Sequence, residues 1–304
     1  MFLRKRKVGK KVKYYLMHKY REGKQVKTIE RYLGTDLKPK QLEKLKARAE
    51  NIIKAHIKEL SAYYHELSKQ EIEQYQHLEK SIQIKHLAKI NWEKFTQSFT
   101  YHTNAIEGST VENSEVKQLL NKNIPPEDAD DLETINVANT IQYIRTAKEK
   151  LTLTFINKIH HMCFKNTKSF AGKFRTGEVV IRDGLGNIHH RGAPQKIVTK
   201  LLKELITWYN KHKNIYPPLL LASVVHNQFE HIHPYADGNG RVGRILLNYI
   251  LLQNKYPPIN IRQQDRMRYY KTLQTYHKTG DVKTTIKFLL NQYKKMGHYK
   301  NTKK

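Results

Sequence analysis

Apolar residues recur at steps of three and four from Pro39 almost to the C-terminus, and this helical period constrains the fold of the chain most strongly. A second helical stretch follows the first over residues 70–90, and residues 198–209 place their apolar side chains on one helix face. The sequence therefore predicts a mainly α protein in which residues 39–90 form a long helical stalk. The apolar positions of the first run are Leu42, Leu45, Ala49, Ile52, Ile53, Ile57, Leu60, Tyr64 and Leu67.

Two regions interrupt the helical period. Residues 11–20 and 25–33 are rich in β-favouring residues and flank the turn-like sequence REGK, which predicts a hairpin. Within residues 176–192, the runs Glu178–Ile181 and Ile188–His190 flank an Asp-Gly-Leu-Gly-Asn turn, which predicts a second hairpin. We therefore expect three domains: a β-hairpin arm over residues 1–38, the stalk over 39–90 and a helical domain over 91–304.

Composition excludes several classes of protein. The chain has 304 residues, with 56 lysines and arginines against 27 acidic residues and a formal net charge of +29. Its one cysteine, Cys163, excludes an intramolecular disulfide and any metal site made of several cysteines. No apolar run approaches the roughly 18 residues that span a bilayer, and no apolar segment follows the basic N-terminus as in a secretory signal. We therefore expect a cytoplasmic protein that does not enter a membrane.

The N-terminal arm is unusually basic. The first 40 residues carry 14 lysines and arginines against three acidic residues. These cations are interleaved with tyrosines such as Tyr14, Tyr20 and Tyr32, as on surfaces that stack bases and bind phosphates. Two interpretations follow: the arm docks nucleic acid or another acidic partner, or it is a lid whose tyrosines pack on the next helix while its lysines stay solvated. The long helical stalk would also suit a homodimer.

The stretch with the most chemical information is residues 226–252, HNQFEHIHPYADGNGRVGRILLNYILL. A helix leads up to His233, where Pro234 ends it. Gly238-Asn239-Gly240 then makes a tight turn into a second helix that opens at Arg241. The free N–H groups of such a turn, together with the positive end of the helix, predict an anion site.

Four side chains add chemistry to this anion site. Arg241 and Arg244 are three residues apart and share a helix face, so both are placed to bind one polyphosphate. Asp237 is a hard oxygen ligand at the position where Mg²⁺ bridging phosphates would sit. His233 stands at the rim, where it can take a proton from an incoming hydroxyl. The set predicts phosphoryl or nucleotidyl transfer.

Two metal-site interpretations of the same stretch have less support in the sequence. His226, His231 and His233 are candidate zinc ligands, but no cysteine or closely spaced acidic residue accompanies them. Residues 237–240 resemble the start of a calcium loop, but the alternating acids and closing glutamate of an EF-hand are missing. We therefore expect His226 and His231 to be structural.

The segment HPYADGNGRVGR, residues 233–244, resembles the Fic family motif HPFx(D/E)GNGRxxR at every specified position except Tyr235, which replaces phenylalanine. The resemblance extends from about Thr103 to Leu290. It implies an all-α Fic core with a β-hairpin flap, and transfer of AMP from ATP to a Ser, Thr or Tyr hydroxyl of a target protein. The roles it implies are general base for His233, Mg²⁺ ligand for Asp237, α-phosphate cradle for Gly238, Asn239 and Gly240, and phosphate clamps for Arg241 and Arg244.

A second motif, TNAIEG over residues 103–108, resembles the family's inhibitory helix (S/T)xxxE(G/N), which we expect over about residues 98–108. Thr103, Glu107 and Gly108 occupy its motif positions. The resemblance implies that Glu107 pairs with Arg244 and blocks the γ-phosphate of ATP, so the resting enzyme would be autoinhibited. In some relatives the same glutamate positions a water that removes AMP, so a de-AMPylase is an alternative function. A nucleic-acid-associated binding module with a degenerate Fic scaffold is another.

The resemblance also assigns two regions around the catalytic loop. The Fic flap docks a target segment as an added strand, and Val179, Val180 and Ile181 would supply that edge. Tyr270 is the expected neighbour of the adenine ring. His277 stands where some relatives carry an asparagine near the adenine, which leaves the nucleotide selectivity open. Neither motif reaches residues 1–90, so the resemblance implies nothing about the arm and the stalk.

Overall fold

The computed structural model describes residues 1–22, 25–60, 67–80, 82–84, 90–121, 125–182, 188–296 and 299–301. Contacts between residues divide the chain into two compact units, Met1–Ala62 and Tyr63–Lys304. Within the described part of the chain, no helix combines the length and the apolar character that a membrane span requires.

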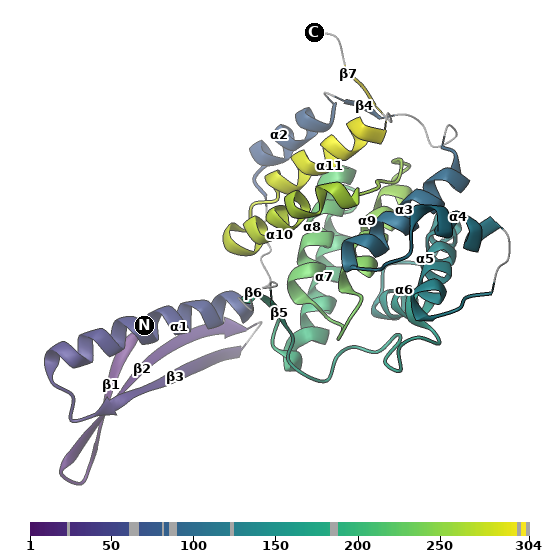
Figure 1. Ribbon diagram of the computed structural model, residues 1–304. Coiled ribbons are helices and arrows are strands. Elements are labelled where there is room, and N and C mark those ends of the chain that lie inside the picture. The colour runs from purple at the N-terminus through teal and green to yellow at the C-terminus, as the bar shows by residue number, and fades with distance from the viewer. Residues whose placement is uncertain are drawn as a thin grey trace. The chain divides into compact units, whose positions relative to one another are not determined.

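The first unit is a three-stranded antiparallel sheet with one helix. Strands β1 (Phe2–Val8), β2 (Lys11–Glu22) and β3 (Gln25–Thr35) lie in the order β1-β2-β3, and α1 (Pro39–Leu60) runs along the sheet (Figure 1). A core of Leu16 and Leu33 from the sheet and Ala49 and Ile53 from α1 joins the two layers.

This sheet is larger than the predicted hairpin. The predicted strands over residues 11–20 and 25–33 correspond to β2 and β3, whereas β1 was not predicted. Its sequence, FLRKRKV, is dominated by cations, so the alternation that marks a half-buried strand is hidden. The tip of the predicted REGK turn, residues 23–24, lies outside the described residues.

The predicted stalk over residues 39–90 is divided between the two units. α1 ends at Leu60 and packs its apolar stripe on the sheet of the first unit, whereas α2 (Lys69–Lys80) belongs to the second. An amphipathic helix gains most of its stability by burying its stripe, and the sheet offers the nearest surface for it. The boundary between the units therefore follows Ala62 rather than residue 38 or residue 90.

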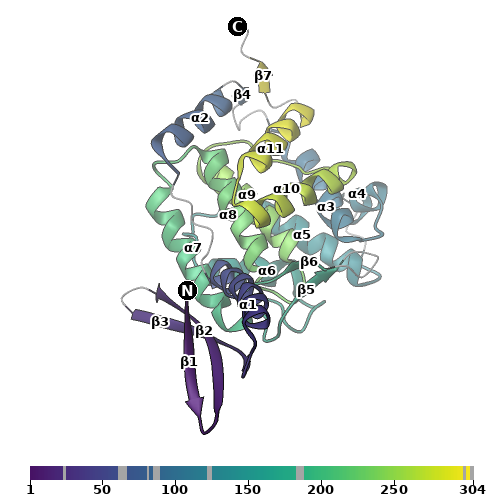
Figure 2. The same ribbon diagram turned by 90° about the vertical axis from the view of Figure 1, so that its left-hand side faces the viewer.

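The second unit is built around α8 (Pro218–Ile232) and α9 (Asn239–Gln253), which pack along each other with nearly all of their residues buried (Figures 1 and 2). α7, α10 and α11 pack against α8, while α3, α5 and α6 pack against α9, and the mainly α architecture is confirmed. The surrounding helices are α3 (Trp92–Glu107), α4 (Asn113–Asn121), α5 (Ala129–Thr146), α6 (Leu153–Phe164), α7 (Val198–His212), α10 (Arg266–Thr279) and α11 (Lys283–Met296), with short 3₁₀ turns at Gln195–Ile197 and Gln263–Asp265.

α2 is held in this unit by a buried carboxylate. Glu79 accepts hydrogen bonds from the backbone N–H of Leu220 at 3.1 Å and from the hydroxyl of Tyr256 at 3.0 Å. Burial raises the pKa of Glu79 to about 7, although these hydrogen bonds lower it. The side chain thus caps the start of α8 from α2.

Two short antiparallel pairs complete the unit. β5 (Val180–Arg182) pairs with β6 (Ile188–Arg191) and forms the predicted second hairpin, whose turn, residues 183–187, lies outside the described residues. β4 (Ile82–Ile84) pairs with β7 (Tyr299–Asn301), a pairing that the sequence did not predict. Strands of three residues are too short to show a period of two.

Candidate active site

The turn between α8 and α9 fixes the catalytic loop. α8 ends at Ile232, and His233 takes a left-handed conformation with φ of +52° as the chain leaves the helix. Gly238, with φ of +81°, then caps the start of α9. A Cβ atom at Gly238 would lie 2.3 Å from the ring of Phe164, so both the conformation and the space require glycine. α9 thus begins two residues before the predicted position at Arg241.

Hydrogen bonds inside the loop make it rigid. The Tyr235 N–H donates to Asn239 Oδ1 at 2.9 Å, and Asn239 Nδ2 donates back to the Tyr235 carbonyl at 2.9 Å. Both polar atoms of the Asn239 side chain are therefore used to hold the loop. The Tyr235 hydroxyl donates to Asn157 Oδ1 at 2.7 Å, so the hydroxyl that phenylalanine would lack has a partner.

His233 is neutral near pH 7. Burial is the largest cause, and together with the neighbouring His190 and Arg175 it lowers the pKa of His233 to about 3. Arg175 also donates from Nε to the His233 carbonyl at 2.8 Å and from Nη1 to the Gly177 carbonyl at 2.6 Å. The imidazole can therefore accept a proton, and Arg175 ties its backbone to the segment that leads into the flap.

Asp237 is ionised at the edge of the loop. Burial alone would raise its pKa, but Arg241, the N–H of Gly238 and Lys168 together lower it below its usual value. Its Oδ1 accepts the Gly238 N–H at 2.6 Å, while Oδ2 lies 3.3 Å from Lys168 Nζ and 3.7 Å from Arg241 Nη2. With about half of its side chain exposed, the carboxylate is accessible to a cation from solvent.

The two arginines of the loop point to different carboxylates. Arg241 forms a buried ion pair and hydrogen bond with Glu133 of α5 and lies 4.4 Å from the ring centroid of Phe164. Arg244, only 1% exposed, donates from Nη2 to Glu107 Oε1 at 2.7 Å, the contact that the resemblance implied. Within the described part of the chain, Arg241 Nε and Arg244 Nη1 are buried and lack a hydrogen-bond partner. Each arginine therefore keeps a donor for a further acceptor.

The end of α3 covers the start of α9. Arg244 also donates to the Thr103 hydroxyl at 2.7 Å and to the Thr103 carbonyl at 2.9 Å. α3 starts at Trp92, six residues before the expected start of the inhibitory helix, and Gly108 closes it with φ of +99°. A Cβ atom on Gly240 would lie 2.2 Å from Glu107 Oε1. Glu107 therefore occupies the space directly over the first turn of α9.

Tyr270 and the flap flank this arrangement. The Tyr270 hydroxyl donates to the Ile106 carbonyl at 3.2 Å, which places Tyr270 against the end of α3. In the flap, Val180 pairs with Arg191, and Val179 accepts the Gly192 N–H at 3.1 Å. Val179, Val180 and Ile181 are partly exposed. Among the described residues β5 pairs only with β6, so the second edge of β5 is open.

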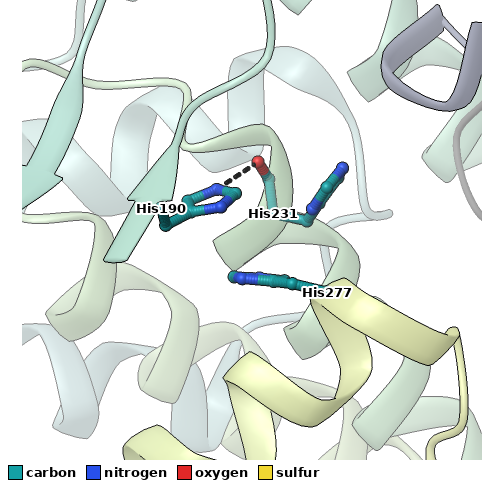
Figure 3. Close-up of side chains that lie close together, drawn as sticks. All are labelled: His190, His231 and His277. Carbon is teal, nitrogen blue, oxygen red and sulfur yellow. Dashed lines mark hydrogen bonds between the residues drawn. The ribbon is translucent and has the colours of Figure 1, made fainter. Parts of the chain in front are cut away.

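Three histidines gather beside the flap, and they differ from the three that the sequence suggested. His190, His231 and His277 come from β6, α8 and α10 and have nitrogen atoms within 4.8 Å of one another (Figure 3). His190 donates from Nε2 to the His231 carbonyl at 2.9 Å, and its ring stacks on His277 with centroids 4.0 Å apart. A tetrahedral zinc ion would instead need the nitrogens about 3.3 Å apart on splayed rings. The His190 and His277 rings are therefore stacked on each other, and the His231 ring is tilted against both.

The other histidines of the suggested zinc set have separate partners. His226 Nε2 shares a hydrogen bond of 2.9 Å with the Tyr269 hydroxyl, and burial lowers the pKa of His226 to about 4. His233 lies in the catalytic loop. The described residues therefore do not assemble His226, His231 and His233 around one point, because the helix α8 directs them to different sides.

Four residues of the site were not predicted. Glu133 and Lys168 surround Arg241 and Asp237, Arg175 ties the flap to the loop, and Glu230 lies under α9. Burial raises the pKa of Glu230 to about 8, since Arg244 only partly offsets the loss of solvent. Each of these four residues is distant in sequence from the residues that it contacts, or lies on a buried helix face. No local pattern in the sequence indicates them.

Known proteins resemble this chain in the region of the site. The sequence profile of the Fic/DOC family matches residues 150–251. The protein adenylyltransferase Fic of Nematostella vectensis is 31% identical over 199 residues, which cover 62% of this chain and 45% of that protein. The protein adenylyltransferase Fic of Aedes aegypti is 28% identical over 202 residues, which cover 62% of this chain and 38% of that protein. The chain thus spans less than half of the length of these relatives.

Solved structures share the fold. A Fic domain containing signaling protein from Bacteroides thetaiotaomicron superposes with a TM-score of 0.60 at 21% identity, covering 80% of this chain and 92% of that one. Fic-1 from C. elegans superposes with a TM-score of 0.59 at 21% identity, covering 86% of this chain and 76% of that one. The helical core and its flap are therefore an arrangement found in known proteins.

Proposed function

We propose that the chain belongs to the Fic/DOC family and is a protein adenylyltransferase that moves AMP from ATP to a Ser, Thr or Tyr hydroxyl of a target protein. The observation that carries the proposal is the loop from His233 to Arg244. It brings a neutral imidazole, an ionised carboxylate and a helix N-terminus to one place, with two arginines buried behind them.

The loop residues have complementary roles in the proposed transfer. His233 accepts the proton of the target hydroxyl as its oxygen forms a bond to the α-phosphorus of ATP. The bond between that phosphorus and the bridging oxygen to the β-phosphate breaks, and pyrophosphate leaves. The N–H groups of the first turn of α9 face the phosphate and stabilise its negative charge. The rigid loop keeps these groups in place without reorganisation during the reaction.

The residues present fit a magnesium nucleotide. Arg241 Nε and Arg244 Nη1 are buried donors whose hydrogen-bonding capacity is unused within the described chain, as expected of groups that receive phosphate oxygens. Asp237 has an ionised and accessible carboxylate next to the loop, and it would hold Mg²⁺. Mg²⁺ bound there neutralises phosphate charge and favours departure of pyrophosphate.

We further propose that the structure corresponds to an inhibited state. Glu107 takes a donor of Arg244 and lies over Gly240, where the phosphates of ATP would approach α9. A carboxylate there repels the nucleotide and occupies part of its space. Transfer would then require the end of α3 to release Arg244.

Removal of AMP is the second candidate, and the position of Glu107 favours it over the remaining alternatives. About 30% of the Glu107 side chain is exposed, so water reaches a carboxylate beside the loop. In that direction Glu107 would activate the water that cleaves AMP from a modified target. The degenerate-scaffold alternative has less support, because His233, Asp237 and both arginines are present and placed together.

The proposal also includes binding partners of the chain. The open edge of β5 at Val179, Val180 and Ile181 would pair with a segment of the target protein. A nucleic acid or another acidic partner is proposed only for the basic N-terminal unit. The stalk that suggested a homodimer is divided between the units, and α1 uses its apolar stripe on its own sheet, so this observation no longer supports a dimer.

Labelling experiments test the direction and the residues. The protein is incubated with Mg²⁺, a cell lysate and ATP that is labelled in the α-phosphate. We expect the wild type to label proteins weakly and Glu107→Gly to label them at least about tenfold more strongly. The double variant Glu107→Gly/His233→Ala should lose this labelling, and ATP labelled in the γ-phosphate should label no protein. Equal labelling by both variants, or none by either, would disprove adenylyl transfer.

A second incubation separates transfer from removal. The labelled products of Glu107→Gly are freed of ATP and given to the wild type or to fresh Glu107→Gly. If the chain is a transferase, the label persists with both proteins. Loss of label with the wild type alone would establish the de-AMPylase alternative.

A further inference from the structure

We infer that the open face of the N-terminal sheet binds double-stranded DNA, with strands β1 to β3 lying in the major groove. The inference goes beyond adenylyl transfer and rests only on residues of the first unit. Side chains alternate between the two faces of a strand, and residues paired directly across strands share a face. Leu3, Leu16 and Leu33 pack in the core with α1, so their neighbours in each strand belong to the opposite face.

That opposite face is basic along β1 and β2. Its cations lack acidic partners, because no ion pair in the described chain involves any of them. Glu30 is the one acidic residue on the described part of this face. A surface with so many unpaired cations favours a polyanion over an ordinary protein partner. The cations are Arg4, Arg6, Lys11, Lys13 and Lys19.

Aromatic residues lie in the middle of the face. Arg4 pairs across to Tyr15, and Tyr15 pairs to Tyr32, so one row crosses all three strands. The rings of Tyr15 and Tyr32 pack together with centroids 5.3 Å apart, and Tyr32 is 55% exposed. Because the two rings lean on each other at 50°, they do not lie flat as a platform for successive unstacked bases. This geometry favours a duplex over a single strand.

The dimensions of the sheet fit the major groove of B-DNA. With strands spaced about 4.8 Å apart, the axes of the two outer strands lie about 10 Å apart, and the groove is about 12 Å wide. β2 has 12 residues and extends about 40 Å, close to the length of one turn of the duplex. The major groove of double-stranded RNA is too narrow and deep for such a sheet. α1 covers the other face and would remain outside the groove.

Fluorescence anisotropy with a labelled mixed-sequence duplex of 25 base pairs tests the inference on the full chain. At 50 mM NaCl we expect a dissociation constant in the micromolar range. Arg4→Gln/Arg6→Gln should bind about tenfold more weakly, and its plot of log affinity against log salt should be shallower by about 1.8. Lys13→Gln/Lys19→Gln is a second open-face variant with the same expected direction. Lys44→Gln/Arg48→Gln removes the same charge from the exposed side of α1 and should stay within about twofold of the wild type.

Competing outcomes overturn the inference. No binding at 50 mM NaCl disproves it, and an equal loss in the α1 variant shows that general charge rather than the open face is responsible. Tighter binding to the single strand, to double-stranded RNA or to vesicles containing phosphatidylserine, with the same dependence on Arg4 and Arg6, assigns the face to another ligand. Circular dichroism of each variant verifies that it is folded. Adenylyl transfer remains untouched by any of these results.

Discussion

The N-terminal unit and the second unit place their charges in opposite ways. The first has a core with four buried residues and keeps its cations on an open sheet face. The second buries Arg241, Arg244 and Glu133 inside its helical core. Exposed charges act at long range and are screened by salt, whereas buried charges act at short range in fixed geometry. The difference indicates that the first unit suits encounter with a polyanion and the second suits preorganised chemistry.

Removing the first unit is the strongest test of this division. Deletion of residues 1–62 should abolish DNA binding and leave labelling by Glu107→Gly within about twofold, because the proposed catalytic residues all lie in the second unit. Deletion of residues 1–38 should instead expose the stripe of α1 that holds Ala49 and Ile53, and cause aggregation. Size-exclusion chromatography and labelling rates measure both effects. Equal behaviour of the two deletions would show that α1 does not need the sheet.

Salt should separate the two units next most strongly. If four phosphates are contacted, raising NaCl from 50 to 300 mM weakens DNA binding by about 10²–10³-fold. The Glu107–Arg244 pair has one partner that is 1% exposed, so the same change should leave the weak labelling by the wild type within about twofold. The DNA-binding assay and the labelling assay are both run over the same series of NaCl concentrations with one protein preparation. A large rise in wild-type labelling with salt would mean that the Glu107–Arg244 contact is as screened as a surface pair.

Two glycines with positive φ provide a matched pair for stability. Gly9 (φ +61°) has no atom within 4 Å of an added Cβ, whereas Gly238 (φ +81°) has the Phe164 ring at 2.3 Å. Gly9→Ala should cost about 1 kcal/mol for the left-handed backbone alone. Gly238→Ala adds overpacking and should cost about 3 kcal/mol in total. Thermal unfolding followed by circular dichroism measures both, and equal losses would show that Phe164 moves aside freely.

The catalytic loop could be predicted because its chemistry is local. His233, Asp237 and Arg244 lie within 12 residues, so their spacing and the Gly-Asn-Gly turn indicate an anion site before any fold is known. The long helical period likewise indicated the mainly α fold. The role of Asn239 was less accessible, since its side chain closes the loop onto Tyr235 rather than remaining free for phosphate.

Contacts between distant segments could not be predicted. Glu133 precedes Arg241 by 108 residues, and a glutamate on a helix gives no sign of a buried partner. The cluster of His190, His231 and His277 joins three elements of the second unit, so no spacing along the sequence indicates it. The interpretation of the arm as a lid on the next helix agrees with the sheet that covers the stripe of α1, where Tyr14 packs, although Tyr32 stays exposed. In each of these examples, segments that are distant in sequence bury the residue, so its contacts depend on the tertiary fold.

Acid should destabilise the second unit through its buried histidines, and this is the smallest of the predicted effects. Burial lowers the pKa of His226 to about 4, of His233 to about 3 and of His277 to about 2. These rings stay neutral when folded but take protons when unfolded below about pH 6.5, so stability falls as the pH drops from 6.5 toward 4. Glu79 and Glu230 have raised pKa values of about 7 and 8. Their contribution to the free energy of unfolding is therefore complete below about pH 4.5 and is lost as the pH rises through those values.

Between pH 6.5 and 4.5 these two groups of residues oppose each other, and the histidines are more numerous, since burial also lowers the pKa of His102 and His160 to about 4. We therefore expect the melting temperature of the second unit to fall by several degrees between pH 7 and pH 5. His277→Phe keeps a ring on His190 but cannot take a proton, so its decrease should be smaller, by about 1 kcal/mol in unfolding free energy. An unchanged decrease in this variant would show that the stack opens to solvent and that His277 is not a buried neutral group.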